Sequence, residues 1–307
     1  MHHVLGASWL LAARAMTQHA TQIQKRVGWH RRWTWCAAGL VLLLAGCSLT
    51  LAYRYADWLI LWQLDHYFDL SSAQRHDLGL RLTPMLAGHR HEAMPQYEAF
   101  LVQIQNRLTQ GLTSQDIDWV YATYDRLRAD LFDRLVADGG VFLASVDPPQ
   151  VRTLEAALQK DHDKAARLVQ APAPERLTKR AQATIDWLED WLGSLSKDQQ
   201  TQIRAWSLAL PDTQAVWVAY NRQRQQELLA FLHQPRTPER AARELRAMLV
   251  YPDATAPQAY QDAVRQMRAA VKTMALAIDQ RLTADQRHRA VTKLQRLIDQ
   301  LQDLQAE

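Results

Sequence analysis

The sequence predicts an all-α protein, a multi-helix bundle of about ten or eleven antiparallel helices that ends in a helical hairpin. Two observations lead to this prediction. Ala, Leu, Gln, Arg, Glu and Asp dominate the chain after residue 47, and the polar–apolar alternation of a strand is missing there. Helix starts with matching cap residues recur through the same part of the chain.

Three segments carry the pattern of a capping box, in which a Ser or Thr at the N-cap is followed three residues later by Gln. They are Ser71 with Gln74, Ser196 with Gln199, and Thr283 with Gln286. Proline at the first helical position predicts two more starts, after Asp147 and after Thr237. Glycine predicts helix ends at Gly88, Gly139-Gly140 and Gly193.

These boundaries predict helices over 51–68, 71–87, 94–109, 113–138, 148–169, 175–192, 196–209, 212–233, 237–250, 256–281 and 283–305. The segment 170–174 contains two prolines, so we expect it to be extended rather than helical. It either divides two subdomains or forms a loop inside one domain.

The last two predicted helices carry narrow apolar seams at alternating spacings of three and four residues. The first seam consists of Val264, Met267, Val271, Met274 and Ile278, and the second of Val291, Leu294, Ile298 and Leu301. Because the turn between the two helices is short, we expect an antiparallel hairpin whose seams face each other.

The positive charge of the chain is confined to its beginning. The chain of 307 residues has 36 basic and 32 acidic side chains, but five of the basic ones and none of the acidic ones lie in 1–46. The remainder is nearly neutral, and nucleic-acid binding, which needs a concentrated basic face, is not expected. A hydrophobic content of 48% and only two cysteines exclude a disordered or disulfide-stapled chain.

The first 46 residues have the organisation of a lipoprotein signal peptide. Basic pairs at Lys25-Arg26 and Arg31-Arg32 precede an apolar stretch over 33–45, which is too short to span a bilayer. The stretch ends in Leu-Ala-Gly followed by Cys47, which resembles the bacterial lipobox. The alternatives are an ordinary signal peptide or an anchor helix that contains a cysteine. Translation starts at Met1 or at Met16.

Lipidation of Cys47 determines the expected location of the protein. Two or three acyl chains, of the palmitate type, anchor a protein stably where one does not. By resemblance to Gram-negative lipoproteins, Ser48 after the cysteine favours the outer membrane, and we expect the domain 47–307 to face the periplasm. Acylation leaves this domain without a free thiol, which excludes catalysis or zinc binding by cysteine.

The first predicted helix after Cys47 is rich in aromatic residues, namely Tyr53, Tyr55, Trp58, Trp62, Tyr67 and Phe68. We expect it to be the buried centre of the bundle, because so much aromatic surface is usually core. The alternative is that its aromatic face lies among lipid headgroups, where Trp and Tyr are favoured.

A polar cluster follows and is the candidate functional site. It comprises Asp65, Tyr67, Gln74, His89, Arg90 and Tyr97. His and Asp side chains suit zinc binding or proton transfer, but the spacing specifies no third metal ligand. We therefore predict no metal and no cofactor, and we favour a solvated turn around His89.

The chain resembles an uncharacterised family of proteobacterial lipoproteins, domain of unknown function 6279. The resemblance rests on Trp58 through Asp65, Tyr67, Asp69-Leu70, Gln74, His89-Arg90, Pro95, Tyr97, Leu101, Trp217, Asn221 and the segment Leu282 through Arg287. It implies an all-helical, lipidated envelope protein and no established activity.

These observations predict an outer-membrane lipoprotein of unknown activity that binds another envelope protein and is not an enzyme. A periplasmic chaperone or stress sensor is the alternative, because the three Leu-Ser/Thr-x-x-Gln segments are similar to a repeated motif of small periplasmic chaperones. The third hypothesis is an enzyme centred on Asp65 and His89, although the sequence lacks phosphate-loop, zinc-protease and serine-hydrolase signatures.

Overall fold

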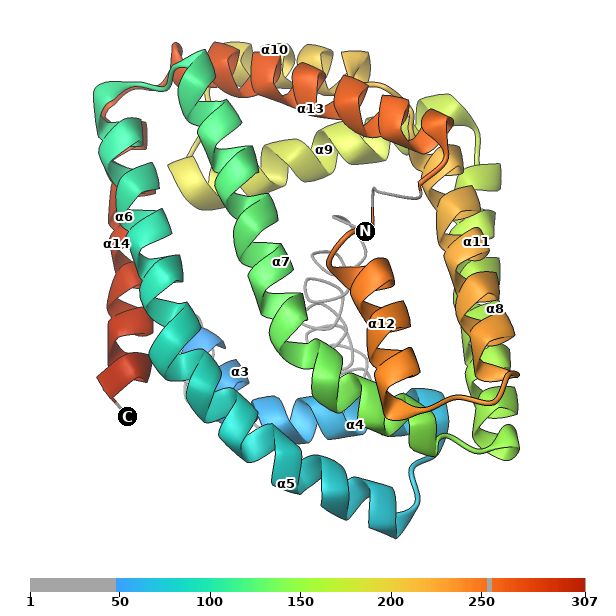
Figure 1. The fold of residues 1–307 in the computed structure, drawn as a ribbon. Coiled ribbons are helices and arrows are strands. Elements are labelled where there is room, and N and C mark those ends of the chain that lie inside the picture. The colour runs from blue at the N-terminus through green and yellow to red at the C-terminus, as the bar shows by residue number, and fades with distance from the viewer. Residues whose placement is uncertain (1–47, 253–255, 307) are drawn as a thin grey trace, which may run out of the picture. The chain divides into compact units, whose positions relative to one another are not determined.

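A computed structural model describes residues 48–252 and 256–306, and every regular element in this part is helical (Figure 1). The chain divides into two compact units, Met1–Tyr53 and Arg54–Glu307. The predicted leader and Cys47 lie outside the described residues. None of the described helices combines the length and the apolar character that a membrane crossing requires.

The predicted all-α class is confirmed, and each predicted helix has a counterpart. The first described helix is α3 (Ser48–Arg54), whose last residue begins the second unit. The second unit contains α4 (Ala56–Phe68), α5 (Ser72–Gly88), a π-helical turn η1 (His89–Ala93), α6 (Met94–Gln110), α7 (Ser114–Ser145), α8 (Pro148–Gln170), α9 (Ala173–Leu192), α10 (Lys197–Ala209), α11 (Gln214–Leu232), α12 (Pro238–Leu249), α13 (Gln258–Asp279) and α14 (Ala284–Ala306).

α5 ends at Gly88 as expected, but the turn expected after it is wrong, because α5, η1 and α6 form one continuous helical segment. In the π-helical turn the N–H of Met94 donates to the carbonyl of His89, five residues earlier. Pro95 explains the wider turn, since proline has no N–H to donate and its ring clashes with the carbonyl four residues before it. His89 therefore lies within a helical segment rather than in a solvated turn.

The expected end at Gly139-Gly140 is also wrong, because α7 continues to Ser145. These glycines allow α12 to approach α7 closely. A Cβ atom added at Gly140 would lie 2.6 Å from the carbonyl oxygen of Pro238 and 2.8 Å from the backbone nitrogen of Ala242. Gly140 therefore allows α7 and α12 to pack closely. α7 continues through this glycine because α12 covers it.

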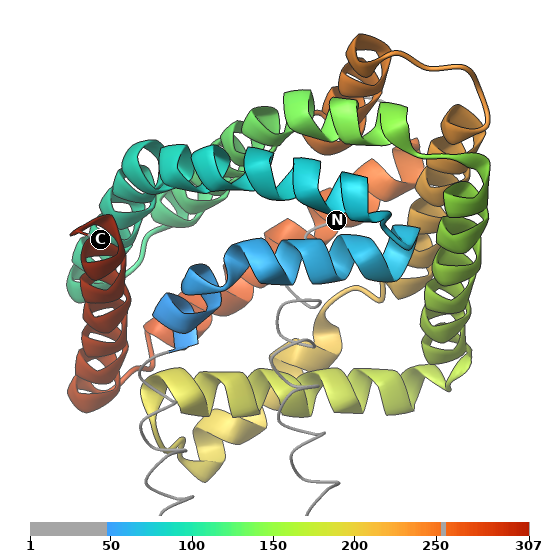
Figure 2. The ribbon, with the colours of Figure 1, turned by 90° about the horizontal axis from the view of Figure 1, so that it is seen from below.

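The last two helices, α13 and α14, do not form the predicted hairpin. Within the second unit α13 packs against α11 and α10, whereas α14 packs against α6 and α9. The two helices run in different directions in both views (Figures 1 and 2). The first seam meets two different clusters, since Val264 packs with Tyr220 and Tyr260, and Ile278 packs against the cluster that joins α9, α10 and α14. The second seam lies on α14, whose partners are α6 and α9. Apolar spacing alone does not specify which helix covers a seam.

The hydrophobic core of the second unit consists of separate clusters. The first joins α4, α5, α7, α8, α11 and α12 through Phe68, Leu70, Leu78, Phe142, Leu143, Val146, Val151, Leu154, Phe231, Leu232 and Ala241. The second joins α9, α10 and α14 through Ile185, Leu188, Leu192, Leu195, Ile203 and Ala290. The predicted extended segment 170–174 shrinks to the connection Ala171–Pro172, and the unit Arg54–Glu307 contains it.

Candidate functional site

Gln74, one of the predicted site residues, belongs to a pair of interlocked helix starts. Ser71 and Gln74 form the predicted capping box at the start of α5, and Asp147 and Gln150 form another at the start of α8. The two glutamine amides also bond to each other, with Gln74 Nε2 3.0 Å from Gln150 Oε1 and Gln150 Nε2 2.6 Å from Gln74 Oε1. We call this reciprocal pair the first amide clasp.

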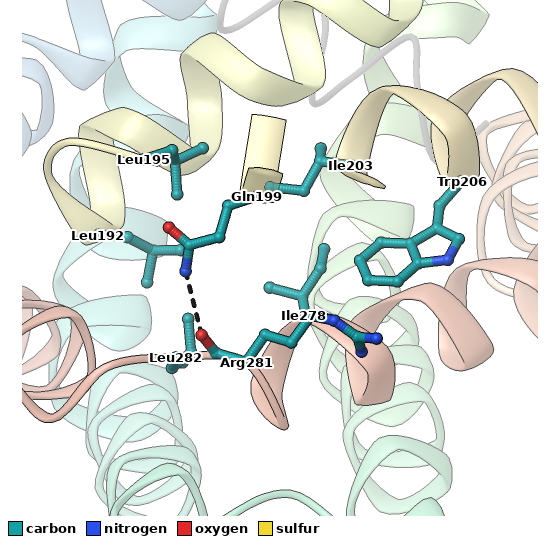
Figure 3. Close-up of a pocket in the computed structure, with 8 residues that line it drawn as sticks. All are labelled: Leu192, Leu195, Gln199, Ile203, Trp206, Ile278, Arg281 and Leu282. Atoms are coloured by element: carbon teal, nitrogen blue, oxygen red, sulfur yellow. Dashed lines mark hydrogen bonds between the residues drawn. The ribbon is translucent and has the colours of Figure 1, made fainter. Parts of the chain in front are cut away.

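The same arrangement occurs a second time, at the starts of α10 and α14. Gln199 and Gln286 exchange amide hydrogen bonds of 2.8 and 3.0 Å. Gln199 also donates to the carbonyl of Arg281, as Figure 3 shows, and Gln286 donates to the carbonyl of Ser194. We call this pair the second amide clasp.

The two clasps account for the three Leu-Ser/Thr-x-x-Gln segments. Two of the three segments pair with each other, and the third pairs with the start of α8. Gln150 was not among the predicted capping residues, although Asp147 followed by Gln150 has the same spacing as the other boxes. The clasps join helix starts that are distant in the chain, and each lies beside one of the two main hydrophobic clusters.

An apolar recess lies beside Gln199 of the second clasp (Figure 3). It is lined by Leu192, Leu195, Gln199, Ile203, Trp206, Ile278, Arg281 and Leu282. Its cavity volume of about 10 Å³ is close to the minimum that holds one water molecule. The recess is a gap in the core packing rather than a site for an organic ligand.

Asp65 and Tyr67 lie at the end of α4, near the first clasp. One carboxylate oxygen of Asp65 accepts from the backbone N–H of Leu70 at 3.1 Å and from Arg75 at 2.7 Å. The hydroxyl of Tyr67 donates to Asp161 on α8 at 2.6 Å. Burial, and then this hydrogen bond to a carboxylate, raises the pKa of Tyr67. Asp65 therefore connects the end of α4 to α5, and Tyr67 connects it to α8.

His89 and Tyr97 lie together on the π-helical turn and the first turns of α6. Their rings are 5.5 Å apart, and His89 Nε2 is 3.2 Å from the hydroxyl of Tyr97. Burial, and then the positive charge of Arg134, lowers the pKa of His89. Arg134 itself pairs with Glu92 at 2.5 Å. The lowered pKa favours the neutral form of His89, and its ring is hydrogen bonded to Tyr97.

The six predicted site residues do not converge on one pocket. Asp65, Tyr67 and Gln74 bond near the start of α5, whereas His89 and Tyr97 bond beyond its end. His89 lies fifteen positions after Gln74 in one helical segment, which at 1.5 Å per residue is about 22 Å. Arg90 neighbours His89 on the same turn. Within the described ranges no group of three His, Cys, Asp or Glu residues is placed to hold a metal ion.

The aromatic residues of α4 lie on different faces of the helix, contrary to the prediction of a fully buried helix. Phe68 is buried, and its ring meets that of Phe142 edge to face at 5.0 Å. Tyr55, Trp58 and Trp62 are exposed, with 59%, 58% and 53% of their surfaces accessible. The expectation failed because one helix can bury only the side that faces its neighbours.

An open recess between α7 and α12 has mixed charge. Its cavity volume is about 340 Å³, and its lining includes Asp130, Asp133, Arg134, Arg246 and Tyr251. Arg246 pairs with Asp133 at 2.5 Å across the two helices. The charged groups of this recess are engaged in ion pairs of the fold.

Comparison with known protein families shows which family the chain belongs to. Residues 66–261 match the model of DUF6279, a family of unknown function. The chain belongs to this family. The match includes the segments of the predicted resemblance from Tyr67 to Asn221, whereas Trp58 through Asp65 and Leu282 through Arg287 lie outside it. No curated protein and no solved structure matches this DUF6279 chain.

Proposed function

We propose that this DUF6279 protein is a lipid-anchored outer-membrane protein that faces the periplasm and acts by binding another envelope component rather than by catalysis. The anchor is the acylated Cys47. The observation that carries this proposal is the lipobox-like sequence at the end of an apolar, basic-flanked leader.

The start of the folded part supports the same proposal. α3 begins at Ser48, directly after Cys47, and the second compact unit begins six residues later at Arg54. A helical unit that follows so closely on a lipidated residue is held next to the bilayer. Two or more acyl chains bind stably enough to keep it there.

The geometry favours binding over the two other hypotheses. An enzyme centred on Asp65 and His89 requires these residues to meet, and they lie at opposite ends of α5. A chaperone that uses its Leu-Ser/Thr-x-x-Gln segments requires them to be accessible to clients, and their glutamines are engaged in the two amide clasps.

Replacing Cys47 by alanine is the test of this proposal. We expect the native protein in the outer-membrane fraction of a sucrose gradient, joined to a discrete partner after crosslinking in cells. The Cys47→Ala variant should leave that fraction and lose the crosslinked product, because acylation requires the thiol. Cys36→Ala is the matched control, since Cys36 lies inside the leader and should leave both results unchanged. Retention of Cys47→Ala in the outer-membrane fraction would contradict the proposal.

A further inference from the structure

Three exposed aromatic side chains lie at the start and along one side of α4. Trp58 and Trp62 are four residues apart, which places them on one helix face, and Tyr55 is the N-cap residue three positions before Trp58. The Trp58 and Trp62 rings stack with centroids 6.4 Å apart. We call this face, Tyr55 with Trp58 and Trp62, the aromatic stripe.

The opposite side of α4 already supplies the core contacts of the helix. Ala56 and Phe68 are buried, and Leu61 and Leu64 pack against the first hydrophobic cluster. The exposed side of α4 carries the polar Gln63 and His66 beside Trp58 and Trp62. A side on which large aromatic residues adjoin polar ones suits the boundary between an apolar phase and water.

The identity of the residues indicates what covers the stripe. Trp and Tyr have an apolar body and a polar N–H or O–H group, and they favour the boundary between lipid headgroups and acyl chains. Helices of this kind lie in the plane of the membrane surface with one apolar face inserted.

The position of the stripe in the chain indicates the same partner. The N-terminal segment outside the described residues, 1–47, ends at Cys47, eleven residues before Trp58. Even a fully extended chain of that length spans no more than about 40 Å, and α3 shortens it. An acylated Cys47 therefore keeps the stripe within reach of the bilayer surface.

We propose that the aromatic stripe of α4 lies in the headgroup region of the bilayer that holds the acyl chains of Cys47. This inference rests on the proposed lipid anchor. The stripe acts as a second membrane contact, and it sets which side of the helical unit faces the lipid.

Fluorescence quenching by lipid tests the contact directly. The purified native lipoprotein is reconstituted into phosphatidylcholine vesicles brominated near the headgroup end of the acyl chains. The Trp58→Phe/Trp62→Phe variant should lose most of the bromine-dependent quenching that native protein shows. Trp187→Phe is the matched control, because Trp187 on α9 is 54% exposed and lies outside the stripe. Equal quenching of the native protein and the double variant would overturn the inference.

A binding measurement separates the stripe from the anchor. The chain from residue 48 onward lacks Cys47 but contains the whole compact unit Arg54–Glu307 and its hydrophobic clusters. We expect it to float with vesicles of phosphatidylethanolamine and phosphatidylglycerol, and Trp58→Ala/Trp62→Ala to weaken this binding by about tenfold or more. Trp187→Ala should bind as the parent chain does.

The outcomes distinguish this inference from the proposed function. If Cys47 is acylated and the stripe variants bind and quench like the parent, the stripe is not a lipid contact and the anchor stands. If Cys47 carries no acyl chain, the proposed function fails whatever the vesicles show. Dimerisation of the chain that the Trp58→Ala/Trp62→Ala variant abolishes, without vesicle binding by the parent, would assign the stripe to a second copy and overturn the inference.

Discussion

Replacing Gly140 by alanine should lower the free energy of unfolding by about 3 kcal/mol, one of the largest effects that a single methyl group can have in this protein. The added Cβ would lie 2.6 Å from the carbonyl oxygen of Pro238 and 2.8 Å from the backbone nitrogen of Ala242. Both are backbone atoms at the start of α12, so the overlap is relieved only by moving the helix away from α7. Urea denaturation followed by circular dichroism measures the change.

The neighbouring glycines provide matched controls. A Cβ at Gly139 would meet only the end of the Leu245 side chain, which can rotate away, so Gly139→Ala should change stability by less than about 1 kcal/mol. A Cβ at Gly79, inside α5, meets nothing within 4 Å, and Gly79→Ala should stabilise by about 0.5–1 kcal/mol. Similar effects of Gly139→Ala and Gly140→Ala would show that the close approach of α12 is not what requires Gly140.

Breaking the second amide clasp should lower the free energy of unfolding by about as much as Gly140→Ala does. Gln286 is only 6% exposed, and its amide bonds to Gln199, to the carbonyl of Ser194 and to the N–H of Thr283. Gln286→Leu removes the side-chain partner of the Ser194 carbonyl and of the Thr283 N–H and one of the partners of Gln199, and we expect a loss of about 3 kcal/mol. For a chain of this size that corresponds to a fall in melting temperature of roughly 6–12 °C, measurable by calorimetry.

Two further variants show whether the reciprocal pairing is responsible. Gln223→Leu removes an exposed glutamine that bonds only to Glu227 one turn away, and it should change stability by less than about 0.5 kcal/mol. In the double variant Gln199→Leu/Gln286→Leu, both partners are apolar, so its loss should be smaller than the sum of the two single losses. Additive losses would mean that the two amides act independently.

The sequence was most informative about features determined by near neighbours. Capping residues such as Ser71, Ser196 and Thr283 act through hydrogen bonds three residues away, and the predicted starts of α5, α10 and α14 agree with the structure to within a residue or two. Glycine was misleading inside α7, because a residue that breaks isolated helices also permits close packing of two helices. That choice depends on α12, which lies about a hundred residues further along the chain.

The candidate site was harder to predict because it depends on which helices meet. The pattern at Gln74 indicated a capping box, but its partner Gln150 could be found only after α5 and α8 were placed together. His89 was expected in a turn because a glycine precedes it, whereas Pro95 converts this region into a π-helical turn. The exposure of Trp58 and Trp62 depends on which side of α4 meets the core, and composition alone carries no such information.

The central claim is that the protein is cleaved before Cys47 and held at a membrane by acyl chains on that residue. Mass spectrometry of the N-terminal peptide of the protein purified from its membrane fraction tests it most directly. We expect a peptide that begins at Cys47 and carries the added mass of two or three acyl chains. A peptide that begins elsewhere, or an unmodified Cys47, would contradict the account.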